Sequence, residues 1–102
     1  MPPSRPPAAT VTVGPDPGRP RSFVVIVRDG GGESRHRVAV SERDAERFAA
    51  LGRDPASVVR AAMAFLLDRE PKESILPTFD IDVIRRYFPE FDDAFPGYLD
   101  RL

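Results

Sequence analysis

The alternation of hydrophobic and polar residues predicts two adjacent β-strands in the first half of the chain. Residues 22–28 (SFVVIVR) are β-branched and apolar on both sides, as expected for a strand whose two faces are covered. Residues 35–40 (RHRVAV) alternate instead, with His36 and two valines on the inward side. The glycine-rich segment DGGGES joins the two strands, so we predict a β-hairpin.

Two helices are predicted after the hairpin, and both have N-terminal signals. Ser41 caps the first helix, ERDAERFAAL, while Asp54 caps the second, whose first position is Pro55. The second helix, SVVRAAMAFLLDRE, is too apolar for one buried stripe, so more than one of its sides must be covered. Either it is the central helix of the domain, or it lies in the seam of a homodimer. The residues assigned to that seam are Val59, Met63, Leu66 and Leu67.

The chain after Pro71 becomes aromatic and acidic. Asp80 is predicted to cap a short third helix that ends before Pro89. The aromatic residues that remain lie among acids, without a recognisable helical or strand period. Such residues either fold back onto the core or dock on another protein. The candidate partner-binding residues of this segment are Phe91, Phe95, Tyr98 and Leu99.

These elements predict a single α+β domain over residues 22–88, in which the hairpin packs on two or three helices. Seven prolines lie in the first twenty residues, so we predict a disordered proline-rich arm over residues 1–21. Within this arm, Thr10–Val13 alternates and is compatible with a short third edge strand, which Pro15 ends. Residues 89–102 are predicted to form an acidic-aromatic tail.

Composition and charge narrow the classes of function. A chain with no cysteine has no disulfides, zinc thiolates or redox chemistry, and a formal net charge of -1 counts against nucleic-acid binding by bulk charge. No apolar run has the length of a signal peptide or a membrane span, so we expect a cytoplasmic protein. Because so small a body buries little apolar surface, we also expect it to self-associate as a homo-oligomer.

No catalytic, metal or cofactor site is predicted. His36 is the only histidine, which leaves neither a His pair nor a Cys–His couple, and we expect it either to be buried and hydrogen-bonded or to lie at the rim of the core. The triple glycine precedes a strand rather than a helix, so it does not match a phosphate-binding loop. Asp80 and Asp82 lie at a helix start, where acids serve as caps. We therefore predict a non-catalytic protein-interaction module, adaptor or regulatory, with a protein partner and no cofactor.

A resemblance supplies an alternative function. Residues 35–70, which contain RVAVSERDAERFAALGRDPASVVRAAMAFLLDRE, resemble the ribbon-helix-helix unit of the Arc and methionine-repressor type. In that family the strands of two protomers pair in the DNA major groove, and the second helices build the dimer core. The resemblance implies that Arg35, Arg37 and Ser57 contact DNA. It also implies a repressor, or an antitoxin whose carboxy-terminal segment binds a toxin.

A second resemblance covers residues 65–91. The stretch FLLDREPKESILPTFDIDVIRRYFPEF is similar to the ends of short, uncharacterised bacterial proteins. It implies a bacterial origin and carries no information about activity.

Overall fold

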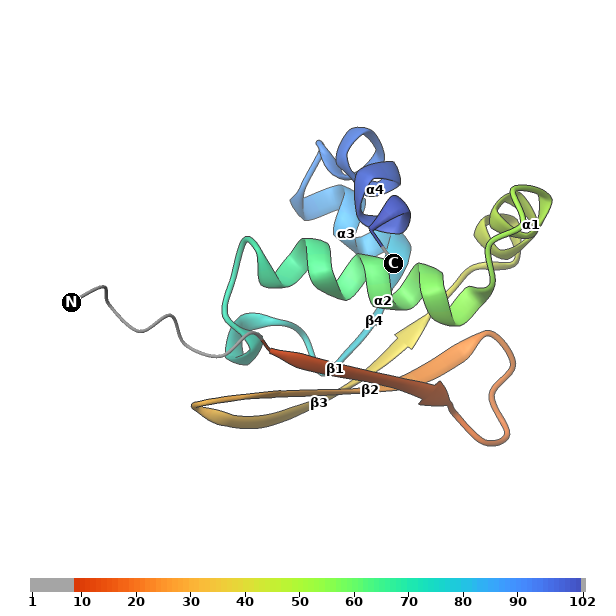
Figure 1. Cartoon of the computed structure of the whole chain (residues 1–102). Helices are drawn as coiled ribbons and strands as arrows, with labels where there is room; N and C mark the ends of the chain where they lie inside the picture. The colour runs from red at the N-terminus through yellow and green to blue at the C-terminus, as the bar shows by residue number, and fades with distance from the viewer. Residues whose placement is uncertain (1–8, 102) are drawn as a thin grey trace.

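The structure is a computed structural model that describes residues 9–101 and contains a four-stranded sheet with helices on one face (Figure 1). The strands are β1 (Thr10–Pro15), β2 (Ser22–Asp29), β3 (Gly32–Ala39) and β4 (Thr78–Asp80). The helices are α1 (Glu42–Ala50), α2 (Pro55–Leu67), α3 (Ile81–Tyr87) and α4 (Phe91–Asp100), with a short 3-10 helix, η1 (Lys72–Ser74). The predicted α+β class is confirmed, and residues 9–101 contain one α-helix more than expected.

The sheet has the strand order β1-β2-β3-β4, and its strands pair antiparallel except for β3 and β4, which run parallel. Strands β2 and β3 form the predicted hairpin, in which Val25 lies opposite His36. The turn between them requires glycine at position 32, because Gly32 has a φ of +117°, which is strained for other residues. The predicted hairpin is confirmed, but β3 begins at Gly32, so the turn is shorter than the predicted segment 29–34.

Strand β1 corrects the predicted disordered arm over residues 1–21 in the part that the structure describes, from residue 9 onward. It pairs with β2 from its first residue to its last, and so forms the edge strand that the local alternation allowed. Its valine side chains pack against the core, and the guanidinium of Arg60 donates a hydrogen bond to the carbonyl of Val11 at 2.7 Å. These contacts come from distant parts of the chain. They outweigh the tendency of the nearby prolines to interrupt strand pairing. Residues 1–8 lie outside the described residues.

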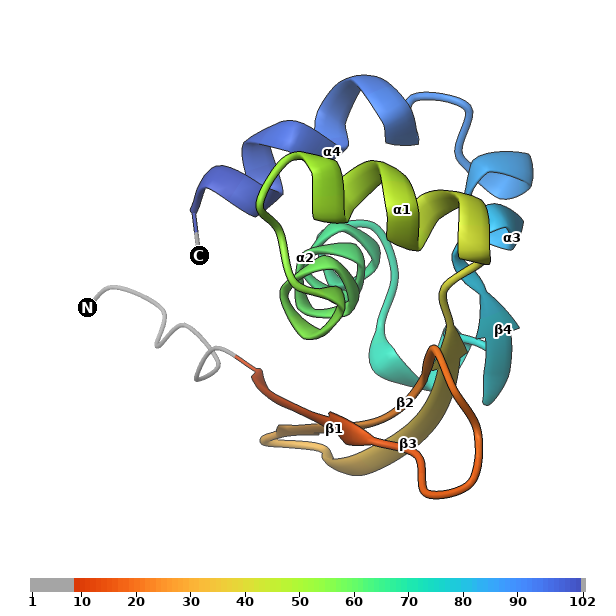
Figure 2. The ribbon, with the colours of Figure 1, turned by 90° about the vertical axis from the view of Figure 1, so that its right-hand side faces the viewer.

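Helix α2 lies between the sheet and a second layer that contains α1 and α4 (Figure 2). Val59 and Met63 have no exposed surface and Leu66 is 4% exposed, while Leu67 is half-buried against the same core. Of the two arrangements that the sequence allowed, the helix therefore adopts the central one. The assignment of these residues to a homodimer seam is corrected, because a single chain already buries them.

The predicted acidic-aromatic tail is also corrected, because the chain there forms helix α4. Phe91, Phe95 and Leu99 recur every four residues along this helix and are 0%, 2% and 5% exposed. The ring of Phe65 in α2 packs edge-on against Phe91 and Tyr98, with centroid distances of 4.9 and 5.7 Å. Phe91, Phe95 and Leu99 therefore complete the protein's own core, and Tyr98 packs against it, so they do not form the exposed docking segment that the sequence suggested.

Removing the ring of Phe91 tests this placement. We expect Phe91→Ala to lower the free energy of unfolding by about 3–5 kcal/mol, because it opens a cavity where α2 meets α4. Tyr87→Ala is the matched control: Tyr87 is 70% exposed, and its loss is expected to change the free energy by less than about 0.5 kcal/mol. Urea unfolding followed by circular dichroism measures both values. Equal effects of the two substitutions would contradict the burial of Phe91.

Candidate protein-interaction surfaces

An apolar groove of about 410 Å³ lies between the end of α2, the loop before β4, and helix α3. We call it the α3 groove. Its lining includes the side chains of Leu66, Glu70, Leu76, Phe79, Val83 and Tyr87. Leu76 and Tyr87 are 46% and 70% exposed, and with Leu51 they are the exposed large hydrophobic residues of the described chain. Two of these three side chains therefore gather at one groove.

The short helix α3 forms one wall of the α3 groove. Asp80 caps it, because the N–H of Asp82 donates a hydrogen bond to the Asp80 Oδ1 at 2.7 Å. The helix has only 7 residues and buries Ile84 in the core. Val83 and Tyr87 are four residues apart, so they share one helical face, and both line the groove.

A buried histidine fixes the backbone at another wall of the α3 groove. His36 is buried in β3, and its Nδ1 lies 2.8 Å from the carbonyl oxygen of Leu76. Its Nε2 lies 2.7 Å from the Oγ of Ser34. The predicted buried, hydrogen-bonded histidine is confirmed. Its contact with the Leu76 carbonyl ties the loop before β4 to the sheet, so the exposed Leu76 side chain extends from a fixed backbone.

Lys72 anchors the same loop to the turn of the hairpin. Its Nζ is buried and lies 2.7 Å from the Oδ1 of Asp29, which also accepts a hydrogen bond from the N–H of Gly31. The hydrogen bond between the two side chains raises the pKa of Lys72 and lowers the pKa of Asp29, because it favours both charged forms. A Cβ on Gly31 would lie 3.3 Å from the Asp29 carboxylate, which favours glycine there. Sequence reasoning missed this contact, although Lys72 is the only lysine.

Among the described residues, the α3 groove carries one charged side chain that has no ion pair. Glu70 forms no ion pair with any residue from 9 to 101, whereas its neighbours Arg69 and Glu73 pair with Glu90 and Lys72. The other lining side chains are uncharged, and most are apolar. A ligand that combines apolar side chains with one positive charge is complementary to such a groove.

The face of the sheet opposite the helices is uncovered within the described chain (Figure 1). Two cross-strand rows on this face consist of Thr12, Ile26 and Arg35, and of Gly14, Val24 and Arg37. Val24 and Ile26 are half-buried, so the prediction that both faces of this strand are covered is wrong. The reason is that the described helices all pack on the other face of the sheet, so no helix is left to cover Val24 and Ile26.

The structure does not bring together the three residues assigned to DNA binding. Arg35 and Arg37 lie on the open sheet face, whereas Ser57 lies in the first turn of α2, on the covered side. The Nε of Arg37 lies 3.3 Å from the Oδ2 of Asp16, while Arg35 forms no ion pair with a described residue. The Oγ of Ser57 donates to the Oδ2 of Asp54 at 2.9 Å, within the helix cap. Strand β3 also pairs with both β2 and β4, unlike a ribbon strand that pairs with a second protomer.

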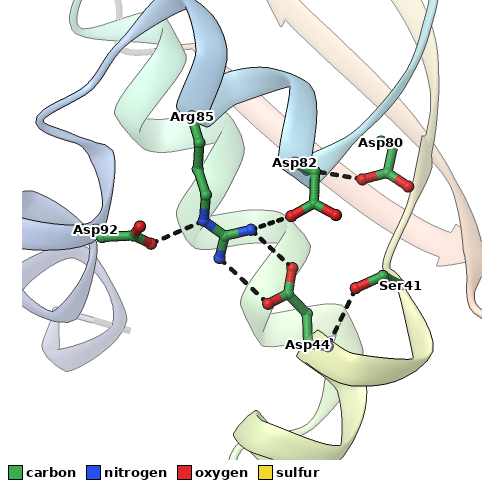
Figure 3. A network of polar contacts seen from close by, with 6 residues as sticks. All are labelled: Ser41, Asp44, Asp80, Asp82, Arg85 and Asp92. Carbon is green, nitrogen blue, oxygen red and sulfur yellow. Dashed lines mark hydrogen bonds and ion pairs between the residues drawn. The ribbon is translucent and has the colours of Figure 1, made fainter.

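Arg85 in α3 is the centre of an ion-pair network that joins three helices (Figure 3). Its Nη1 and Nη2 donate to the two carboxylate oxygens of Asp44 in α1, at 3.0 and 3.2 Å. Its Nε donates to Asp92 in α4 at 2.8 Å, and its Nη1 also reaches Asp82. Burial alone lowers the pKa of Arg85, but the hydrogen bonds to Asp44 and Asp92 outweigh it and raise the pKa. One guanidinium balances only part of the charge of these three carboxylates, and its contacts with them give the acids a structural role.

Two helix caps complete the network in Figure 3. The Oγ of Ser41 accepts a hydrogen bond from the N–H of Asp44 at 3.1 Å, as the sequence predicts for the first helix. The carboxylate of Asp44 then has no role in its own cap and is directed to Arg85 instead. Asp80 and Asp82 also lie at a helix start, as expected from the sequence.

Arg85→Met leaves the buried carboxylate of Asp44 without its partner. We expect this substitution to lower the free energy of unfolding by about 3–5 kcal/mol. Arg86→Met is the matched control, because Arg86 is the next residue of α3, is exposed, and forms no ion pair with a described residue. Its expected effect is below about 0.5 kcal/mol in the same denaturation measurement. If both variants lost equal stability, the network would not be holding the three helices together.

Among residues 9–101, no group of three or more His, Cys, Asp and Glu side chains could hold a metal ion. None of the described helices is both long enough and apolar enough to cross a membrane. The chain matches no family model, no curated protein and no solved structure.

Proposed function

We propose that this protein is a small non-catalytic interaction module whose protein partner docks in the α3 groove. The observation that carries the proposal is the gathering of Leu76 and Tyr87 at an apolar groove of about 410 Å³. Tyrosine is enriched among the few residues that supply most of the free energy at protein interfaces, and the apolar surface around it excludes water from the contact. The cysteine-free composition suits a reducing compartment, so we also propose a cytoplasmic location.

The anchoring of the groove walls supports this proposal. The loop before β4 is tied to the sheet by His36 and to the hairpin turn by Lys72. Helix α3 is capped by Asp80 and held to two other helices by Arg85. A groove built on such fixed elements needs little ordering when a ligand binds, which raises the affinity that a given apolar contact provides.

A displayed library of random peptides tests the proposal without knowledge of the natural partner. We expect the library to yield peptides that bind the wild type, and Tyr87→Ala to weaken their binding by about tenfold or more. Leu51→Ala is the matched control, because Leu51 is 67% exposed but lies in α1's C-terminal turn, away from the groove. Its binding constant is expected to equal that of the wild type. The measurement is isothermal titration calorimetry with each selected peptide.

Two outcomes of the library experiment would count against the α3 groove. In the first, no peptide is selected on the wild type. In the second, peptides are selected but bind Tyr87→Ala and Leu51→Ala equally well. The Tyr87→Ala variant is expected to remain folded, because the side chain it removes is mostly exposed.

DNA binding is a second candidate function, favoured by the sheet face that no described helix covers and by Arg35 on it, which forms no ion pair within residues 9–101. Under this alternative the protein is a repressor or antitoxin. We expect Arg35→Ala to weaken DNA binding by about 1–3 kcal/mol, and Arg43→Ala, on the exposed side of α1, to have no comparable effect. Fluorescence anisotropy at low salt measures the affinity for DNA. Repeating the titration at increasing salt shows how much of the binding free energy comes from electrostatic contacts with phosphates. Failure of the wild type to bind any DNA fragment at low salt would eliminate this candidate.

A further inference from the structure

We propose that the occupant of the α3 groove is a proline-rich segment containing an arginine, namely Pro2–Pro7 (PPSRPP) of a second copy of this chain. This inference rests on the proposed function, since it identifies the ligand of the same groove. It follows from the chemistry of the groove walls, the chemistry of this segment, and the position at which the segment joins the fold.

The groove has the features by which proteins recognise proline-rich ligands. Such ligands adopt the polyproline II conformation and dock their rings against aromatic side chains. The α3 groove presents the exposed ring of Tyr87 together with Phe79 and Phe88. Glu70 adds a carboxylate that forms no ion pair within residues 9–101, so it is free to pair with a basic residue of the ligand.

The segment Pro2–Pro7 carries the complementary groups in a compatible order. A polyproline II helix has about three residues per turn, so Pro3 and Pro6 fall on the same side of it. Arg5 is the only charged side chain of the segment. Its guanidinium would give Glu70 the positively charged partner that the described residues do not provide. Prolines also restrict the unbound chain, which lowers the ordering cost of docking.

The place where the segment joins the fold favours a groove on a second copy. Strand β1 lies at one edge of the sheet and β4, beside the groove, lies at the other (Figure 2). Three strand spacings separate these edges by about 14 Å. Pro6 and Arg5 lie only three and four residues before Ala9, where the described fold begins. Four residues in the polyproline II conformation span about 12 Å, which is less than the width of the sheet. Arg5 and Pro6 therefore fall short of the groove of their own chain, whereas those of a second copy can approach without this limit.

The test compares the self-association of full-length variants by sedimentation equilibrium up to about 1 mM protein. We expect the wild type to associate, and association to weaken by about tenfold when either side of the contact is altered. Pro3→Ala combined with Pro6→Ala alters the ligand, and Tyr87→Ala alters the groove. Leu51→Ala is the control and should associate like the wild type. A wild type that remains monomeric throughout this range overturns the proposal.

Mixing the two defective variants tests whether they fail to associate because the contact between segment and groove is lost, or for an unrelated reason. The proline variant keeps an intact groove, and Tyr87→Ala keeps an intact segment, so each supplies what the other lacks. We expect the mixture to associate more strongly than either variant alone. A mixture no stronger than its components overturns the proposal.

Titration with a synthetic peptide of residues 1–9 separates failure of this inference from failure of the proposed function. The peptide is expected to bind the full-length proline variant and to compete there with peptides selected from the library. If library peptides bind the groove but this peptide does not compete, the interaction function stands and the self-recognition is wrong. If neither kind of peptide binds, both are wrong.

Discussion

The apolarity of helix α2 is the constraint on which the rest of the structure depends. Its buried residues are Val58, Val59, Ala61, Ala62, Met63, Phe65 and Leu66. Each large side chain among them stabilises the fold by about 1.5–3 kcal/mol only if water is excluded from it. A sheet covers one side of a helix, so the opposite side requires a second layer. Helices α1 and α4 provide that layer, and the rings of Phe48 and Phe95 join them at a centroid distance of 5.4 Å.

The arrangement around α2 also explains which surfaces stay open. The described helices all pack on one face of the sheet, so none of them covers the other face, where Val24 and Ile26 are only half-buried. Helix α3 has only 7 residues, and it flanks the end of α2 without closing over it. The α3 groove is the space that this short helix leaves. The candidate interaction surface is thus a direct consequence of how the core is covered.

Buried polar contacts fix the irregular parts of this core. Arg85 reaches Asp44 across 41 residues of sequence, and His36 reaches the Leu76 carbonyl across 40. Lys72 joins η1 to the hairpin turn through Asp29. Buried ion pairs add little net stability because desolvation offsets their attraction, but losing one partner is costly. Their main effect here is to select one placement of the loop and of α3, which gives the α3 groove fixed walls.

The sequence alone determined the elements whose signals are local. The hairpin follows from strand alternation around a glycine-rich turn, and the caps at Ser41, Asp54 and Asp80 mark helix starts because a cap involves only neighbouring residues. The apolarity of α2 also predicted that several of its sides are covered.

Tertiary structure decided which elements cover α2. The four-residue spacing of Phe91, Phe95 and Leu99 was a readable helical signal, but Pro96 and Gly97 obscured it, and only packing against α2 compensates for both. The edge strand β1 and the α3 groove likewise depend on contacts between distant segments, and local patterns do not specify those partners.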